Sequence, residues 1–217
     1  MIDTKSTEFL LSLYDRFGDK AQDALNFVKR NQGMKDDEIP AANFSLANGV
    51  YLIYKDGSYI EYTEQPVFTD YISIGIAHDG HYFRVPLYWD YGKQQLLKED
   101  GYNEDSHCVC ETDMLMNWDF VGETEYLRQL GLAFVLRHEH YIPTGPVFLA
   151  MYANRNQLNA ALTAAGSDEI DFKKDYWVAQ RNGVYNAWLF YGYNRSLIND
   201  YVYYASQVCA VAPWEPR

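Results

Sequence analysis

The fold of this chain is decided by a stretch that opens with Tyr141-Ile142-Pro143-Thr144-Gly145-Pro146 and closes near Trp214. A helical pattern follows the opening motif. We expect one helix over 146–165, because proline is tolerated in a first helical turn and Gly166 is a stop signal. Three strand-like stretches come next: Tyr176-Trp177-Val178-Ala179, Tyr185-Asn186-Ala187-Trp188-Leu189-Phe190 and Val208-Cys209-Ala210-Val211.

The order of these motifs resembles that of a large bacterial and phage family of C-type-lectin-like domains, which is related in fold to the formylglycine-generating enzyme. Its members show a W-x-L-P-S entry, a helix ending in I-N-A-A-L, a Y-W-S-S strand, an N-A-W strand and a closing V-R-x-V-R. The segments that match are 141–144, 159–162, 176–179, 186–188 and 208–212. The resemblance implies a domain that displays a variable binding surface and usually does no chemistry.

The chain departs from the family pattern at polar positions. Tyr141-Ile142-Pro143-Thr144 stands in place of the W-x-L-P-S entry, and Val178 and Ala179 replace the serines of the Y-W-S-S strand. Cys209 and Ala212 replace the closing arginines. Because the order is kept while the polar residues change, the resemblance bears on the fold more than on the site.

Two predicted hairpins precede this stretch. Strand patterns over 49–54 and 59–62 flank a turn that contains Asp56-Gly57, and Asp-Gly between strands is a strong hairpin signal. Strand patterns over 72–77 and 82–85 flank a second Asp-Gly pair. These segments also resemble the leading strands of the family.

The remaining segments set the expected domain boundaries. Apolar residues recur at helical spacing over 6–30, so residues 1–47 are expected to form an N-terminal helix and a linker. The lectin-like domain would span 48–217, with an insertion near 88–112 that we expect to be an irregular surface loop. A helix is predicted over 119–130, ended by a glycine.

The composition limits the class of protein. The chain has 30 acidic and 18 basic side chains, for a formal net charge of −12. Such a charge repels phosphate backbones, and no basic stripe is present, so the sequence argues against nucleic-acid binding. The 20 tyrosines suit β-rich folds and wet binding faces, since each ring combines apolar area with a hydroxyl.

Cysteines and apolar runs bear on the compartment. The three cysteines, Cys108, Cys110 and Cys209, are an odd number, which fits a reducing compartment better than a disulfide scaffold. The first residues lack a basic region followed by an apolar run, and no apolar stretch approaches membrane-spanning length. We therefore expect synthesis in the cytosol, with no signal peptide, lipid anchor or membrane insertion.

Three clusters contain residue types that could bind a metal or carry out chemistry. His107-Cys108-Val109-Cys110 has C-x-C spacing without a second cysteine pair, which argues against a zinc site. His138-Glu139-His140 would place both imidazoles on one side of a strand, but no third metal ligand is evident. Cys209 stands alone in an apolar stretch and is expected to be a buried thiol, whereas oxidase chemistry needs a second one. The sequence thus predicts no enzyme, metal or cofactor.

The segment 182–204 carries the candidate binding residues. Tyrosine beside asparagine, serine and glycine is the composition of adaptable binding surfaces, in which rigid rings stand beside flexible hydrogen-bonding groups. The segment also contains Tyr203 and Tyr204. The alternative is that its tyrosines pack an ordinary small sheet, since Tyr201 and Tyr203 alternate with Val202. Eight residues are predicted to bind a ligand: Asn182, Tyr185, Asn186, Tyr191, Tyr193, Asn194, Asn199 and Tyr201.

These observations predict an α+β fold: a C-type-lectin-like domain with two helices and small antiparallel sheets, preceded by an N-terminal helix. The expected function is a non-enzymatic structural or receptor-binding component of a phage virion, such as a head-fibre or tail-associated protein. Its partners would be other virion proteins or a host-surface glycan or protein, and a homo-oligomer, most simply a trimer, is expected. The alternatives are a bacterial surface or secreted adhesin that binds glycans and an enzyme of the formylglycine-generating type.

Overall fold

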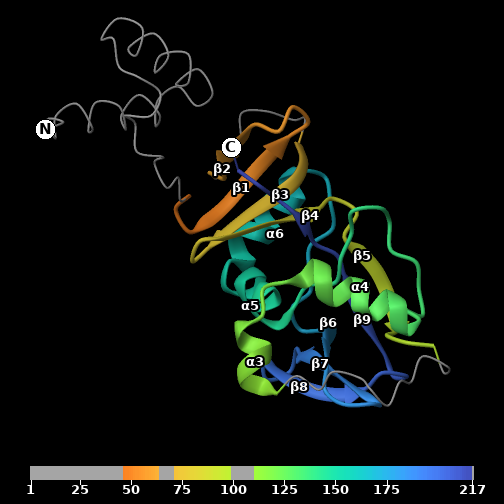
Figure 1. The fold of residues 1–217 in the computed structure, drawn as a ribbon. Coiled ribbons are helices and arrows are strands. Elements are labelled where there is room, and N and C mark those ends of the chain that lie inside the picture. Colours follow the sequence, from red (N-terminus) through yellow and green to blue (C-terminus); the bar gives the residue numbers. More distant parts are fainter. Residues whose placement is uncertain (1–45, 64–70, 99–109, 217) are drawn as a thin grey trace, which may run out of the picture. The chain divides into compact units, whose positions relative to one another are not determined.

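A computed structural model describes residues 46–63, 71–98 and 110–216 of the chain. The chain divides into two compact units, Met1–Ser45 and Leu46–Arg217. All of the described residues belong to the second unit, which Figure 1 shows as a coloured ribbon. The helix predicted over 6–30 lies outside the described residues.

The first sheet has five strands in the order β10-β4-β3-β1-β2, and every neighbouring pair is antiparallel. Both predicted hairpins are confirmed. Gly57 and Gly80 adopt φ of 85° and 79° in their turns, a backbone conformation that glycine reaches without steric cost. The strands are β1 Gly49–Tyr54, β2 Tyr59–Glu61, β3 Tyr71–His78, β4 His81–Pro86 and β10 Ala212–Pro213.

The second sheet has five strands in the order β5-β9-β6-β7-β8. Its neighbours are antiparallel except for β6 and β9, which are parallel. The strands are β5 Asp90–Gln95, β6 Tyr176–Arg181, β7 Asn186–Tyr191, β8 Ser196–Tyr201 and β9 Ala205–Cys209.

Strand β5 corrects the expectation that the segment near 88–112 begins as an irregular surface loop. Residues 90–95 pair with β9, and Trp89, Leu96 and Leu97 are buried on either side of the strand. The sequence of β5 is polar and therefore shows no strand pattern. An edge strand with one exposed face needs few apolar residues of its own. Residues 99–109 lie outside the described part of the chain.

Four helices occur in the described residues: α3 Glu111–Met116, α4 Phe120–Leu130, α5 Gly145–Ala153 and α6 Arg155–Ala164. The helix predicted over 119–130 is confirmed as α4. The Asp119 side chain accepts a hydrogen bond from the backbone N–H of Gly122, and Gly131 ends the helix at φ 98°, as expected of an N-cap and a left-handed C-cap.

The single helix predicted over 146–165 is wrong, because the chain breaks between α5 and α6. Asn154 adopts φ −96° and ψ 11° at the break, where it ends one helix and begins the next. Its side-chain Nδ2 donates to the carbonyl of Ala150 at 2.9 Å. An asparagine side chain competes in this way with the backbone for local hydrogen bonds, and this is why it disrupts a helix interior.

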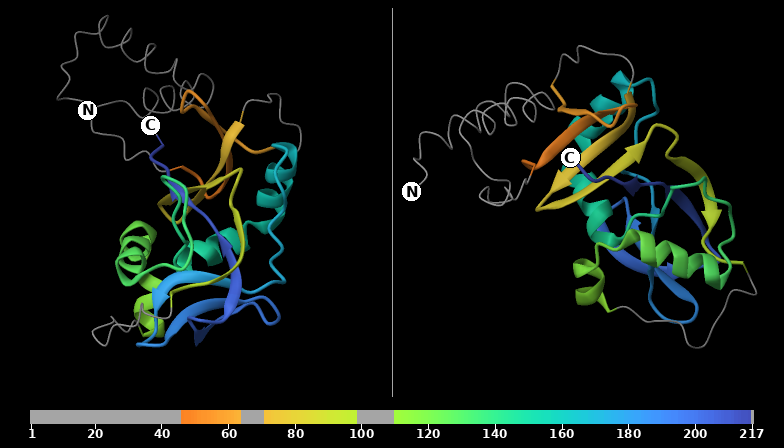
Figure 2. Two further views of the ribbon diagram at one scale, coloured as in Figure 1. Left: turned by 90° about the vertical axis from the view of Figure 1, so that its right-hand side faces the viewer. Right: turned by 45° about the horizontal axis from the view of Figure 1, so that its top comes forward.

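Helix α5 lies between the two sheets, in contact with β3 of the first and with β6 and β7 of the second. Figures 1 and 2 show the sheets at opposite ends of the unit, with α6 against the first. Phe148 of α5 is fully buried, and its ring centroid lies 4.7 Å from that of Phe190 and 5.2 Å from that of Tyr176. The main core therefore forms around α5, and the unit has an α+β architecture.

Candidate functional site

The end of β8 and the turn that leads to β9 display three tyrosines. Tyr201, Tyr203 and Tyr204 are 44%, 37% and 51% exposed. The rings of Tyr201 and Tyr203 stack with centroids 5.2 Å apart and planes 20° apart. The Tyr204 ring meets both edge-on, at 5.7 Å and 5.1 Å. We call these three residues the tyrosine cluster; stacked and edge-on contacts stabilise such an arrangement.

Val202 fixes the backbone of this turn. Its side chain is fully buried, its N–H donates to the carbonyl of Tyr185 at 2.9 Å, and its carbonyl accepts from the N–H of Leu96 at 2.9 Å. The N–H of Tyr204 also donates to the carbonyl of Tyr201 at 2.9 Å and closes the turn. The tyrosine cluster is thus presented on an anchored turn, which reduces the ordering cost when a ligand binds.

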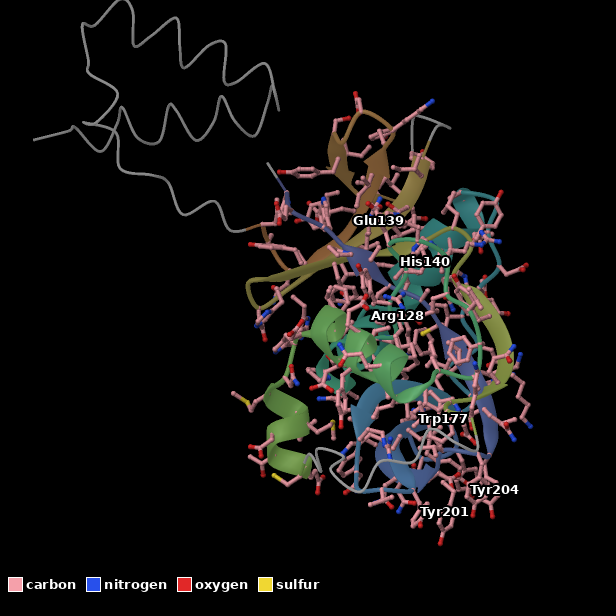
Figure 3. The ribbon with its side chains drawn as sticks, turned by 45° about the vertical axis from the view of Figure 1, so that its right-hand side comes forward. Arg128, Glu139, His140, Trp177, Tyr201 and Tyr204 are labelled. Atoms are coloured by element: carbon pink, nitrogen blue, oxygen red, sulfur yellow. The ribbon has the colours of Figure 1, made fainter. Side chains whose placement is uncertain are left out.

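The loop between β6 and β7 supplies a fourth exposed ring beside the turn. Tyr185 is 56% exposed, and its carbonyl holds the Val202 amide. The loop closes on the buried side chain of Arg181, whose guanidinium donates to the carbonyls of Gly183, Val184 and Asn186. In Figure 3, Tyr201 and Tyr204 lie side by side at this end of the second sheet, with Trp177 toward the interior.

The structure divides seven of the eight predicted binding residues into two groups and places the eighth, Asn199, between them. Strands β7 and β8 form a hairpin in which Asn186 pairs with Tyr201 at one end and Tyr191 pairs with Ser196 at the other. These ends lie about 17 Å apart, at 3.3 to 3.4 Å per residue. Asn199 lies between them, opposite Trp188. The members are Asn182, Tyr185, Asn186 and Tyr201 at the tyrosine-cluster end, and Tyr191, Tyr193 and Asn194 at the far end.

Members of the first group differ in what they present to solvent. Tyr185 and Tyr201 are exposed, whereas Asn182 and Asn186 are partly buried. The side-chain Oδ1 of Asn186 is buried, and no hydrogen-bond partner for it occurs among the described residues. Asn186 therefore contributes to the loop structure more than to an exposed surface. At the far end, Tyr193 is 87% exposed and its ring lies 6.1 Å from that of Tyr191.

Sequence reasoning missed the centre of the candidate site. Tyr203 and Tyr204 lie in the tyrosine-rich segment but were not among the eight candidates. The usable signal was Val202, a single apolar residue between tyrosines, which is the pattern of a buried anchor. The contribution of Leu96 had no local signal, since it comes from the segment that we expected to be a surface loop.

Asp200 is the charged residue that directly precedes the tyrosine cluster. Asp200 is partly buried, and its carboxylate accepts a hydrogen bond from the backbone N–H of Tyr201 at 2.8 Å. Among the described residues, no group of three or more histidines, cysteines, aspartates or glutamates could hold a metal ion.

Two of the three cysteines, Cys110 and Cys209, lie in the described residues. Cys209 is fully buried, as predicted, and burial raises the pKa of its thiol well above the ordinary value. A thiol of this kind is a poor nucleophile, because the thiolate is the reactive form. Cys110 is exposed, and its Sγ lies 3.2 Å from Asp113 Oδ2. His107 and Cys108 lie outside the described residues.

His138-Glu139-His140 does not form the strand that would place both imidazoles on one side. His138 and Glu139 form a turn, in which Glu139 has φ 60°. Glu139 forms an ion pair with Arg84 at 3.3 Å, and His140 Nδ1 lies 2.8 Å from the Tyr91 hydroxyl. Figure 3 shows Glu139 and His140 far from Tyr201 and Tyr204. These residues therefore belong to a structural network away from the tyrosine cluster.

Comparison with protein families, characterised proteins and solved structures finds no match for this chain. None of the helices in the described part of the chain is long and apolar enough to cross a membrane. The assignment of a function therefore depends on the geometry of the site and on the motif order.

Proposed function

We propose that this chain is a non-enzymatic binding protein whose ligand surface consists of the tyrosine cluster and Tyr185. The observation that carries the proposal is the exposure of four tyrosine rings on backbone that buried residues hold in place. Tyrosine supplies a large contact area at a low cost in side-chain entropy, and its hydroxyl adds a hydrogen bond. Exposed aromatic groups on a rigid scaffold are typical of binding residues.

We further propose that the unit is a C-type-lectin-like domain and that it serves as a structural or receptor-binding component of a phage virion. The motif order over 141–212 supports this setting, and an α+β architecture is compatible with it. The ligand would be a host-surface glycan or protein. Several copies in one particle, most simply as a trimer, would strengthen weak single-site binding by multivalency.

The binding surface is tested by a pair of variants in the full chain. The purified protein is applied to an array of neutral and anionic oligosaccharides and to a panel of intact bacterial cells. Replacing both Tyr203 and Tyr204 by alanine should weaken binding about tenfold or more, since each stacked ring contributes on the order of 1 kcal/mol. Tyr193→Ala is the matched control, because it removes an even more exposed ring from the far end of the hairpin.

The outcomes separate the possibilities clearly. Equal losses from both changes would show that the exposed rings contribute non-specifically, and this would overturn the proposed surface. A wild-type chain that binds neither the array nor any cell would overturn the binding function itself.

The setting has its own test. Immunogold electron microscopy of purified phage particles should label the head fibres or the tail if the chain is a virion component. Label on bacterial cell surfaces, with none on particles, would favour the alternative of a glycan-binding adhesin.

A further inference from the structure

We infer that Arg181 is the positioning residue of the binding surface: its guanidinium takes the place that a bound cation would have in the β6–β7 loop. The inference rests on the proposed function where it concerns ligand binding. It begins from an unusual observation, a positively charged side chain that is only 1% exposed. Burying a charge is costly unless its hydrogen-bonding groups find partners, so the surroundings of Arg181 explain what it does.

Three backbone carbonyls of one short loop converge on the Arg181 side chain. Nε donates to the carbonyl of Asn186 at 3.2 Å, and Nη2 donates to the carbonyls of Gly183, at 2.8 Å, and Val184. The Asn186 carbonyl also accepts from the N–H of Asn182 at 2.9 Å. The loop thus folds around a positive charge, as loops do around hard cations that carbonyl oxygens coordinate.

The guanidinium also connects this loop to the tyrosine cluster. Tyr185 lies between Val184 and Asn186, whose carbonyls accept from the Arg181 guanidinium. The carbonyl of Tyr185 accepts from the Val202 N–H at the start of the β8–β9 turn. Because Val202 fixes the turn that carries the cluster, the placement of all four exposed rings depends on the closed loop. Arg181 therefore acts through the loop without being on the exposed surface itself.

Arginine is suited to this position by its shape. Its planar guanidinium presents donors in a fixed fork and stays charged, whereas lysine offers a compact charge on a flexible stem. A side chain without donors would remove the hydrogen bonds that the carbonyls of Gly183 and Val184 accept from Arg181, and an acceptor left unpaired on folding costs the desolvation penalty of that group. Since the cation belongs to the chain, closure of the loop requires no divalent metal.

The experiment compares wild-type protein with Arg181→Gln and Arg181→Lys in the full chain. Hydrogen exchange, followed by mass spectrometry, reports on peptides that cover 182–186 and 201–204. In Arg181→Gln, exchange of these peptides should become about 5- to 150-fold faster, as expected for the loss of hydrogen bonds worth about 1 to 3 kcal/mol. Exchange of β3, in the first sheet, should stay unchanged. In Arg181→Lys, exchange of the peptides that cover 182–186 and 201–204 should be faster than in the wild type and slower than in Arg181→Gln.

A rescue measurement separates positioning from general destabilisation. Arg181→Ala removes the side chain and leaves space, so guanidinium ion at low millimolar concentration should slow exchange of both peptides again, whereas sodium at the same ionic strength should not. Binding to the oligosaccharide array and to cells should be strongest for the wild type, weaker for Arg181→Lys and weakest for Arg181→Gln. Wild-type binding should be unchanged by EDTA.

The results distinguish this inference from the proposed function. Unchanged exchange in the glutamine and alanine variants, or wild-type binding that EDTA abolishes, would overturn the role of Arg181. If the glutamine variant unfolds as a whole, the lysine variant and the guanidinium rescue still test whether Arg181 positions the loop. If the wild-type chain binds neither probe, the proposed function fails, while the exchange and rescue results still test the loop.

Discussion

Gly192, in the turn between β7 and β8, occupies a position with no room for a side chain. A Cβ atom there would overlap the backbone carbonyl groups of Lys173 and Lys174. The Gly192 N–H also donates to Asp175 Oδ1 at 2.9 Å, which holds the two segments together. Because the neighbouring atoms are backbone, they cannot turn aside as a flexible side chain would.

We expect Gly192→Ala to lower the free energy of unfolding by about 3 kcal/mol, the upper end of the usual cost of overpacking. Gly49→Ala is the matched control, since the nearest atom to its added Cβ would lie at an ordinary 3.7 Å. Urea unfolding of both variants measures the difference. A loss below about 1 kcal/mol for Gly192→Ala would mean that the turn can move away from Lys173.

The connection between α4 and α5 illustrates how an element without regular structure is fixed. The Tyr91 oxygen accepts from the N–H of Arg137 at 2.8 Å, so its single proton is free to donate to His140 Nδ1, also at 2.8 Å. Arg128 holds the carbonyl of His140 at 2.9 Å. In the neutral ring, Nδ1 can accept this hydrogen bond, whereas in the charged ring both nitrogens are donors.

This connection should make the stability depend on pH. Burial, together with the positive charges of Arg137 and Arg84, lowers the pKa of His140 below its ordinary 6.5, and Glu139 opposes the shift. The unfolded chain therefore binds the proton more readily than the folded chain. Consequently, the contribution of His140 is fully present above pH 6.5 and is lost as the pH falls through the folded-state pKa.

The measurement is the free energy of unfolding at a series of pH values from about 5 to 8, for wild-type protein and for His140→Gln. The difference between the two curves isolates His140, since the other titrating groups are common to both chains. We expect the wild type to lose more stability on acidification than the variant. Parallel curves would contradict the assigned state of His140.

At the scale of the whole molecule, the C-terminal segment joins the two sheets. After β9 in the second sheet, the chain crosses to the first, where β10 pairs with β4. The Trp214 ring then covers the first sheet opposite Gly75, where an added Cβ would meet it at 2.6 Å. Its centroid lies 5.4 to 6.2 Å from those of Tyr51, Tyr59 and Tyr82.

Loss of this ring should destabilise the unit as a whole. Trp214 is 8% exposed, and we expect Trp214→Ala to cost about 3 to 5 kcal/mol, the usual range for a buried tryptophan. Trp214→Phe, which keeps an aromatic ring over Gly75, should cost clearly less. Thermal and urea unfolding check both values. Equal effects of the two changes would show that the ring does not pack as described.

Some features were predictable because their causes are local. Asp56-Gly57 and the second Asp-Gly pair specify tight turns by their own backbone preferences, and Asp119 and Gly131 specify the ends of α4. The burial of Cys209 followed from its apolar neighbours. By contrast, the break at Asn154 involves a side-chain hydrogen bond to the backbone, which the helical spacing of apolar residues does not reveal.

The sequence by itself determined the hairpins, helix α4 and an α+β composition, because turn and cap residues act on their immediate neighbours. Only the tertiary structure decided which tyrosines meet. It placed β5 beside β9, brought Leu96 to Val202, and separated Tyr193 from Tyr201 along one hairpin. The physical reason is that pairing between distant strands, and the burial that accompanies it, depends on contacts that leave no signal in either segment alone.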